Sequence, residues 1–305
     1  MQRRSFLRVA AAAALLPACR RSSKLKLALN WKPDPQFGGF YAAPYARHGL
    51  DVEILPGGAG TPTVQMIGAG SAEFGIVSAD ELVLARARGN RAVALFAVFQ
   101  NCPQGIMVHA SRRLTSIGDV VKEGTLAIQR GLPYARLLEK RYGFAHVRVV
   151  PSPGGDITAF LHDEKFAQQC FIMSEPLEAR RKGVEVTVFP VSDLGYNPYT
   201  TVLATSEDYL RNHADTAKRM TDAVREGWRT YLDHPQPTNE KMHQLNPSMD
   251  LSTFAEVAEA QKPFIEAAQL GAMTEQRWQT LIQQLRDLGD LTGPIRASDC
   301  FRNLS

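Results

Sequence analysis

The chain begins its alternation of apolar and polar positions at residue 25. Leucines at 25, 27 and 29 alternate with Lys26 and Ala28, which predicts a β-strand. The small residues after Gly38 favour a helix that packs closely on a sheet and ends at Gly49, and residues 50–55 repeat the strand pattern. Strand, helix and strand predict a right-handed βαβ unit, and ligands of such units bind at the carboxyl ends of the strands.

Aromatic residues, prolines and glycines fill the connection that follows the first strand. Pro33 and Pro35 disfavour both ladder pairing and helix, so we predict a stiff, exposed loop from Trp31 to Phe37. This loop lies at the carboxyl end of the strand, where a ligand is expected. We therefore predict that Trp31 or Phe37 contacts the ligand, and we add Tyr41, one turn into the helix, as a further candidate.

The same kind of alternation continues to about residue 205. Residues 91–99 are almost continuously apolar, which is typical of a strand buried on both faces of a parallel sheet. Further strands are predicted at 74–78, 105–109, 125–128, 147–150, 170–173, 185–189 and 200–205. Helices are predicted at 61–67, 79–88, 133–142, 156–162 and 175–182, and long helical segments at 207–233, 251–267 and 274–288.

This order of elements indicates two α/β lobes. The chain is too long for one ordinary core, and its helical tail must bury its apolar faces against the first sheet. The chain therefore crosses between the lobes twice, near residues 100–110 and 196–205. We predict lobe 1 from residues 19–104 and 200–305 and lobe 2 from residues 105–199. Two such linkers form a hinge, which commonly closes around a ligand.

The first 18 residues have the pattern of an export signal. Arg3 and Arg4 form a twin-arginine pattern, and an apolar run follows that is too short to span a membrane. The sequence Leu16-Pro-Ala-Cys19 resembles a bacterial lipoprotein cleavage site. We predict a signal peptide at 1–18 and a lipid anchor on Cys19, with cleavage without lipidation as the alternative.

Removing this peptide changes the charge balance. It takes away three arginines and no acid, so the formal net charge falls from +4 to +1, and no nucleic-acid partner is indicated. Apart from Cys19, the cysteines are Cys102, Cys170 and Cys300, which allow one disulfide and have no metal-ligand spacing. The seven histidines are scattered. The sequence therefore predicts no metal, no cofactor and no catalytic residue.

Several polar residues follow predicted strands and are candidates for ligand contact. Helix capping explains one of Asp80 and Glu81, and the other carboxylate would face the cleft and accept hydrogen bonds from amino groups. This weighs against an anionic ligand, which needs the helix N-terminus for itself. Glu175 is either a first-turn acid of its helix or a ligand acceptor. Gly131 and Gly155 lie in turns whose N–H groups can face the cleft.

Five motifs resemble a known family. They are Asn30-Trp31-x-Pro33-x-x-Gln36-Phe37-x-Gly39-Phe40-Tyr41, Gly49-Leu-Asp-Val-Glu-Ile54, Gly70-x-x-x-Phe74-Gly-Ile, Ser174-Glu-Pro-x-Glu-Ala179 and Gly195-Tyr-Asn-Pro-Tyr199. Over residues 24–210 the chain resembles periplasmic solute-binding proteins of ABC importers in the nitrate, sulfonate and taurine class. It is most similar to the branch that contains binders and synthases of thiamine pyrimidine precursors.

The resemblance implies a type II periplasmic-binding-protein fold, in which two α/β lobes clamp a solute and pass it to a membrane permease driven by a cytoplasmic ATPase. In the pyrimidine branch an aromatic pair stacks on the heterocycle while acids and amides read its polar edge. This implies such roles for Trp31, Phe37, Asp80, Glu81, Gln100, Glu175 and Tyr196.

One departure from the family pattern separates transport from catalysis. The synthases resemble Trp-x-Pro-Asn-x-x-His and carry a cysteine cluster, whereas this chain has Phe37 at the histidine position and an isolated Cys170. We therefore predict a non-enzymatic binder of a small heteroaromatic, with a thiamine pyrimidine precursor as the first candidate. The alternatives are riboflavin, a sulfonate or nitrate, and a pyrimidine synthase activity. The predicted ligand contacts are Trp31, Gln36, Phe37, Tyr41, Asp80, Glu81, Gln100, Gly131, Glu175 and Tyr196.

Overall fold

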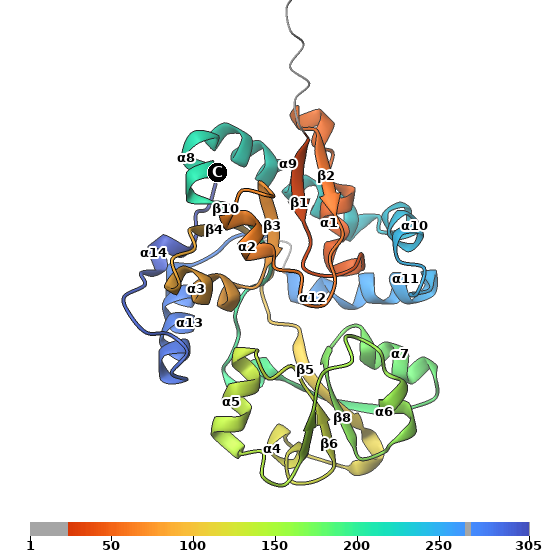
Figure 1. Cartoon of the computed structure of the whole chain (residues 1–305). Helices are drawn as coiled ribbons and strands as arrows, with labels where there is room; N and C mark the ends of the chain where they lie inside the picture. Colours follow the sequence, from red (N-terminus) through yellow and green to blue (C-terminus); the bar gives the residue numbers. More distant parts are fainter. Residues whose placement is uncertain (1–23, 266–269, 305) are drawn as a thin grey trace, which may run out of the picture.

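A computed structural model describes residues 24–265 and 270–304 of the 305-residue chain. The predicted signal peptide and Cys19 lie outside the described residues. The structure contains two five-stranded sheets, and Figure 1 shows one in the upper part of the molecule and the other in the lower part, joined by two stretches of chain. We call the upper part lobe 1 and the lower part lobe 2.

The sheet of lobe 1 has the strand order β2-β1-β3-β10-β4. Its strands are β1 (Leu25–Ala28), β2 (Val52–Leu55), β3 (Phe74–Val77), β4 (Ala92–Phe99) and β10 (Thr200–Ser206). Strand β1 pairs in parallel with β2 and β3, which confirms the predicted βαβ unit. Strand β10, which returns from lobe 2, runs antiparallel to both β3 and β4.

Strand β4 is not the strand of a parallel sheet that was predicted. All eight of its residues are buried, as expected, but it lies at the edge of the sheet and its one neighbouring strand is antiparallel. Isolated bridges from Ala94 to Phe301 and from Ala97 to Gly271 cover its outer edge. Ala94 packs in one hydrophobic core cluster and Leu95 in another, so both faces of β4 are covered, and the two bridges protect its edge in place of a further strand.

The sheet of lobe 2 has the order β7-β6-β8-β5-β9. Its strands are β5 (Gln104–His109), β6 (Thr125–Ala127), β7 (Arg148–Val150), β8 (Phe166–Phe171) and β9 (Val186–Pro190). Its helices are α4 (Ile117–Val120), α5 (Pro133–Tyr142), α6 (Thr158–His162) and α7 (Glu175–Arg181), with short 3-10 turns η3 (Ala110–Arg112) and η4 (Val191–Leu194). Strand β8 begins four residues before its predicted start because it contains two glutamines, which break the apolar pattern.

The chain passes between the lobes after β4 and again before β10, close to the two predicted crossings. The region after β10 is helical. It consists of α8 (Glu207–Asn212), α9 (Ala214–Asp233), α10 (Gln236–Leu245), α11 (Leu251–Ala260), α12 (Lys262–Ile265), α13 (Glu275–Asp287) and α14 (Ala297–Cys300). The predicted helix at 207–233 breaks at His213, and α10 and α14 were not predicted. Two lobes, two crossings and a helical C-terminal region confirm the predicted fold class.

The first lobe also contains η1 (Pro35–Phe37), α1 (Gly38–Ala42), η2 (Tyr45–His48), α2 (Thr63–Gly68) and α3 (Ala79–Ala87). The prediction of an exposed, non-helical loop up to Phe37 is wrong. Pro35 opens the 3-10 turn η1, and the Asp34 carboxylate caps it by accepting from the Gln36 backbone N–H at 3.1 Å. Proline is compatible with a first helical position, and Pro33, Pro35 and Phe37 are buried.

The glycine pair after Phe37 serves close packing between α1 and α9. A Cβ on Gly38 would lie 2.0 Å from Cε1 of Tyr231, and one on Gly39 would lie 2.1 Å from Cγ of Trp228. On the other side, a Cβ on Gly227 of α9 would lie 2.2 Å from the Gly39 carbonyl oxygen. These three glycines allow α1 to rest directly on the aromatic rings of α9, which fixes the start of lobe 1 against its helical tail.

Candidate functional site

Trp31 lies at one of the places where the two lobes meet. It follows β1 in lobe 1 and is half-buried. Opposite it lies the turn between β7 and α6 in lobe 2, where a Cβ on Gly154 would lie 3.4 Å from Cη2 of Trp31 and one on Gly155 would lie 3.9 Å from its Cζ2. Both glycines have positive φ, which L-residues rarely adopt. The indole edge of one lobe therefore faces a backbone turn of the other.

The Asp34 carboxyl lies next to this contact and is tied to its own loop. It accepts hydrogen bonds from the backbone N–H of Gln36 and from its Nε2, the latter at 2.9 Å. The Oε1 of Gln36 in turn accepts from Thr201 Oγ1 at 3.3 Å, which links the loop to β10 beside the second crossing. Burial raises the pKa of Asp34 to about 7 despite these bonds.

Glu175 contributes a carboxyl from lobe 2. It is the first residue of α7, its Oε2 accepts from the Phe171 backbone N–H at 2.9 Å, and its Oε1 lies 3.8 Å from the Cβ position of Gly155. Burial raises its pKa to about 7, and the negative charge of Asp34 adds to this increase. Two carboxyls from opposite lobes are therefore close enough to influence each other beside Trp31.

Asp80 and Glu81 lie in the first turn of α3 and differ in their surroundings. The Asp80 carboxylate accepts from Ser78 Oγ at 2.5 Å, from the Glu81 backbone N–H at 2.9 Å and from the Tyr196 hydroxyl at 2.8 Å. Asp80 and Tyr196 are both buried and connect α3 to the second crossing. Glu81 is the half-buried member of the pair, and burial together with the charge of Asp80 raises its pKa to about 7.

The other predicted contacts have structural partners of their own in this conformation. The Phe37 ring has no exposed surface and belongs to the core of lobe 1, and Tyr41 lies beneath Lys241. The Gln100 amide donates to the carbonyl oxygens of Ala97 and Ala272 at 3.2 and 3.0 Å. Gly131 is exposed. The structure thus gathers Trp31, Gln36 and Glu175 around the contact between the lobes, and a ligand role for the remaining residues stays a prediction.

Sequence reasoning missed Asp34, although a signal for it existed. An aspartate before a proline is a common start of a helical turn, and its carboxylate then points at the first backbone N–H groups. The positive φ of Thr201, 51°, could not be predicted from the sequence, because β-branched residues seldom adopt positive φ.

The charges around Trp31 limit what the site can bind. Asp34 and Glu175 have pKa values raised to about 7 by burial, so further negative charge would be poorly stabilised there. Carboxyls suit ligands that donate hydrogen bonds through N–H groups. Among residues 24–265 and 270–304, no three His, Cys, Asp or Glu side chains are placed to hold a metal ion.

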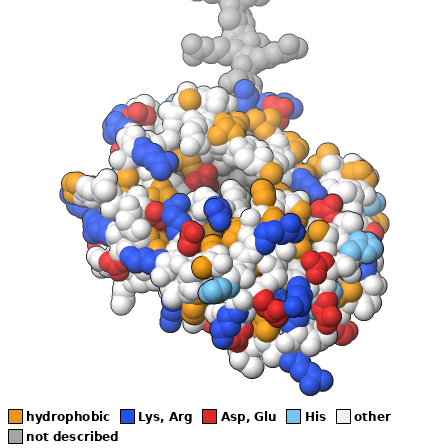
Figure 2. Space-filling model, turned by 60° about the horizontal axis from the view of Figure 1, so that its bottom comes forward, with side chains coloured by type: hydrophobic (Ala, Val, Ile, Leu, Met, Phe, Trp, Pro, Cys, Tyr) orange, Lys and Arg blue, Asp and Glu red, His pale blue; other side chains and the backbone are white. Residues whose placement is uncertain are grey.

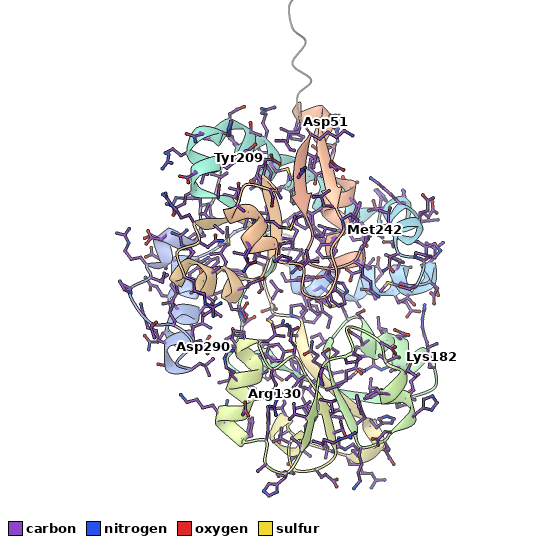
Figure 3. All side chains as sticks on the ribbon, in the orientation of Figure 1. Asp51, Arg130, Lys182, Tyr209, Met242 and Asp290 are labelled. Atoms are coloured by element: carbon purple, nitrogen blue, oxygen red, sulfur yellow. The ribbon has the colours of Figure 1, made fainter. Side chains whose placement is uncertain are left out.

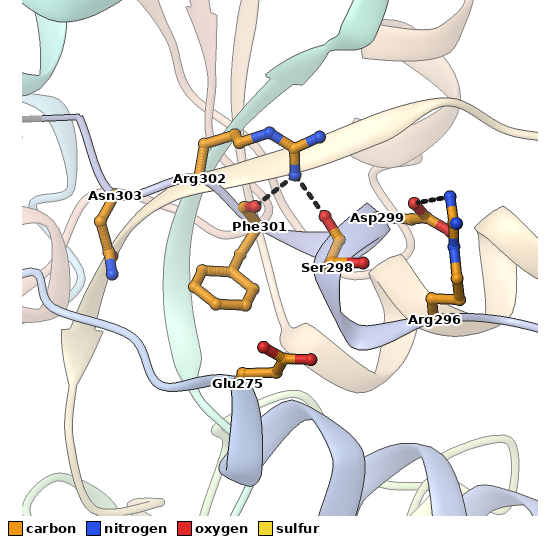
Figure 4. Close-up of a pocket in the computed structure, with 7 residues that line it drawn as sticks. All are labelled: Glu275, Arg296, Ser298, Asp299, Phe301, Arg302 and Asn303. Atoms are coloured by element: carbon orange, nitrogen blue, oxygen red, sulfur yellow. Dashed lines mark hydrogen bonds and ion pairs between the residues drawn. The ribbon is translucent and has the colours of Figure 1, made fainter.

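The surface gives further context for the site. Figure 2 shows acidic and basic side chains interspersed over the face that it presents, with a hollow in the upper half of that face and an acidic side chain at its edge. A separate pocket lies between the start of α13 and the α14 segment (Figure 4), where Arg296 pairs with Asp299 and Arg302 donates to backbone carbonyls of Ser298 and Phe301. The charged side chains of Arg296, Asp299 and Arg302 are thus paired within the α14 segment itself.

The raised pKa of Glu175 predicts a pH dependence of stability. The folded chain binds this proton more tightly than the unfolded chain, in which the pKa is near 4.5, so stability falls as the pH rises from about 4.5 to about 7. Glu175→Gln removes the ionisable group and can keep the bond from Phe171. We expect it to raise the free energy of unfolding by about 1–2 kcal/mol at pH 8 and to change it little at pH 4.5.

Urea unfolding at the two pH values measures this effect. Glu185→Gln, which removes an exposed carboxyl of the same lobe, serves as the control and should behave alike at both. An equal effect of Glu175→Gln at pH 4.5 and pH 8 would show that the Glu175 carboxyl is not protonated preferentially in the folded state.

Relatives of known function cover most of the chain. The riboflavin-binding protein RibY of Chloroflexus aurantiacus is 26% identical over 306 residues, which cover 92% of this chain and 85% of the relative. The formylaminopyrimidine-binding protein of Halalkalibacterium halodurans is 21% identical over 309 residues, which cover 92% of this chain and 90% of the relative. The ligand in each name is that of the relative.

Solved structures show the fold. The periplasmic aliphatic sulphonate binding protein SsuA of Escherichia coli superposes with a TM-score of 0.72 at 14% identity, with 92% of each chain covered. A Candida albicans protein described as having the generic periplasmic binding protein fold superposes with a TM-score of 0.63 at 16% identity, covering 93% of this chain and 98% of that one. At these identities the likeness concerns the fold.

A known family of sequences matches a continuous segment of the chain, beyond the five separate motifs. Residues 34–238 match the family described as NMT1/THI5 like, which is more than half of the chain. This segment includes Asp34, the glycine turn opposite Trp31 and Glu175. The resemblance inferred from the motifs is confirmed, and the chain belongs to the NMT1/THI5-like family.

Proposed function

We propose that this protein is the exported solute-binding component of an ABC importer and that it captures a flat heteroaromatic solute between its lobes. The observation that carries the proposal is the arrangement around Trp31. Its indole faces the Gly154–Gly155 turn of the other lobe, and the Asp34 and Glu175 carboxyls lie beside it. An aromatic face with nearby carboxyl acceptors suits a ring that stacks and donates N–H groups.

A thiamine pyrimidine precursor is our first candidate ligand. An aminopyrimidine offers one small aromatic ring with an exocyclic amino group, which fits the half-buried Trp31 and a pair of carboxyls. The relative named as a formylaminopyrimidine-binding protein supports this choice. Riboflavin is the second candidate, because the riboflavin-binding relative has the higher identity of the two.

Two other classes fit less well. A sulfonate or nitrate would place an anion among carboxyls whose pKa values are already raised by burial, which is unfavourable even though SsuA has the same fold. A synthase resembling the family's enzymes would need a histidine at the position of Phe37. The ring of Phe37 packs in the core instead, so we propose binding and delivery rather than catalysis.

The proposed location follows from the export signal. The mature chain would be held at the membrane by lipid on Cys19 and would deliver its solute to a permease driven by a cytoplasmic ATPase. In the part of the chain that the structure describes, no helix has both the length and the apolar character needed to cross a bilayer.

Thermal unfolding with a panel of solutes tests the proposed function. The purified chain is heated alone and with 4-amino-5-hydroxymethyl-2-methylpyrimidine, formylaminopyrimidine, riboflavin, taurine and nitrate. A ligand that binds only the folded state raises the free energy of unfolding, by roughly 3 kcal/mol when its concentration is 100 times its Kd. The transition temperature rises accordingly. We expect a rise with at least one heteroaromatic and none with the anions. Stabilisation by taurine or nitrate alone would overturn the proposal.

A further inference from the structure

Helix α11 connects both walls of the site. It packs against η1, the turn that Asp34 caps in lobe 1, and against α7, the helix that begins with Glu175 in lobe 2. The residue that follows α11 and the residue that follows α10 also hold the Asp34 loop. Gln261 Nε2 donates to the Pro35 carbonyl at 3.0 Å, and Asn246 Nδ2 donates to the Pro33 carbonyl at 2.8 Å. The loop of lobe 1 is therefore fixed to the α10–α11 region.

Arg181, at the last turn of α7, fastens lobe 2 to the same helix. Its guanidinium forms a fork on Glu256, with Nε 3.1 Å from Oε2 and Nη2 2.8 Å from Oε1. Its Nη1 lies 3.0 Å from Oδ1 of Asp250 and also donates to Thr253 Oγ1. Asp250 is itself the N-cap of α11 and accepts from the Thr253 backbone N–H at 2.7 Å. One side chain of lobe 2 thus meets three partners in lobe 1.

We propose that Arg181 is a positioning residue that holds α7 against α11 and so sets the separation of the Asp34 and Glu175 carboxyls when the lobes are together. The inference rests on the proposed function in that these carboxyls read the solute. Glu175 and Arg181 are the two ends of one seven-residue helix, about 9 Å long, so a shift at Arg181 moves the carboxyl at the other end. A planar guanidinium fork fixes orientation as well as distance.

The second set of contacts between the lobes lies elsewhere. Arg136 of α5 pairs with Asp290 at 2.6 Å, beside α13, whose Gln284 donates to the Gly195 carbonyl at the second crossing. Figure 3 shows Asp290 and Lys182, the neighbour of Arg181, on opposite sides of the molecule. The Arg136 pair is close to where the chain itself joins the lobes, whereas the Arg181 contacts hold the opposite flank. Loss of Arg181 should therefore open the clamp more than loss of Arg136.

Small-angle X-ray scattering of the solute-free chain tests this role without any assumption about the ligand. Arg181→Gln removes the charge and the fork, Arg181→Lys keeps the charge, and Arg180→Gln removes an exposed cation from the same helix. We expect a larger radius of gyration for Arg181→Gln, an intermediate value for Arg181→Lys and the wild-type value for Arg180→Gln. Raising the salt to about 1 M should move the wild type toward Arg181→Gln, because screening weakens partly exposed ion pairs.

Binding provides the second readout. If Arg181→Gln lowers the closed fraction by roughly 3- to 10-fold, the Kd for the heteroaromatic that binds the wild type should rise by the same factor, because only the closed state binds tightly. Circular dichroism checks that the variant is folded. Scattering curves of folded Arg181→Gln that match the wild type at low salt would overturn the inference. Failure of the wild type to bind any heteroaromatic would instead overturn the proposed function and leave the scattering result to decide on Arg181.

Discussion

Replacing Gly39 with alanine should destabilise the chain by about 3 kcal/mol, measured as the loss in free energy of unfolding in urea. The new Cβ would lie 2.1 Å from Cγ of Trp228, and atoms that close must move apart. Trp228 is fully buried and its ring packs edge-on to Phe40 and Tyr231, so it has no free direction in which to shift. Overpacking of a filled core typically costs 1–3 kcal/mol, and this contact belongs at the upper end.

Gly131→Ala is the matched control for this prediction. Gly131 is exposed, has no heavy atom within 4 Å of its Cβ position and does not have positive φ. We expect its free energy of unfolding to stay within about 0.5 kcal/mol of the wild type. Equal midpoints for Gly39→Ala and Gly131→Ala would contradict the close packing of α1 on α9.

Trp31→Ala should weaken binding of the heteroaromatic by roughly 10- to 100-fold while the chain remains folded. Removing one aromatic platform from under a stacked base costs about 1–3 kcal/mol, and each 1.4 kcal/mol changes the Kd tenfold. Trp31 is half-buried and lies at the border of the core, whereas Trp228 and Trp278 are fully buried. Its loss should therefore affect the ligand more than the fold.

Fluorescence titration measures this effect together with a second variant. Trp31→Phe keeps an aromatic ring and should retain most of the affinity, with little ligand-induced quenching because its remaining tryptophans lie in the core. Thermal unfolding of both variants without ligand checks the fold. Wild-type affinity in Trp31→Ala would remove Trp31 from the site and with it the observation on which the proposed function depends.

Much of the fold could be predicted from local patterns. The βαβ unit, helix α5 and the two crossings follow from alternation, caps and the switch to helical composition, which depend on neighbours in sequence. The position of β4 could not be predicted, because Phe301 and Gly271 cover its edge from the far end of the chain. The role of the glycine pair could not be predicted for the same reason. Its function depends on Trp228 and Tyr231, almost 200 residues later.

The candidate site shows the same division. Trp31 and Glu175 could be identified because each follows a strand, where ligands of α/β sheets bind. The Asp80–Tyr196 bond and the link from Gln36 to Thr201 join residues more than 100 positions apart, and neither partner suggests the other. Phe37 is buried because it lies in the 3-10 turn η1. The sequence did not predict this turn, because Pro33 and Pro35 indicated a non-helical loop. Local chemistry predicted residues on both sides of the contact between the lobes, and only packing showed which side chains are already paired.

The most direct test of a heteroaromatic-binding clamp is isothermal titration calorimetry of the purified chain with 4-amino-5-hydroxymethyl-2-methylpyrimidine, riboflavin, taurine and nitrate. We predict saturable binding of one heteroaromatic per chain, which Trp31→Ala weakens, and no heat of binding for the two anions. Saturable binding of taurine or nitrate with no response to either heteroaromatic would contradict the account.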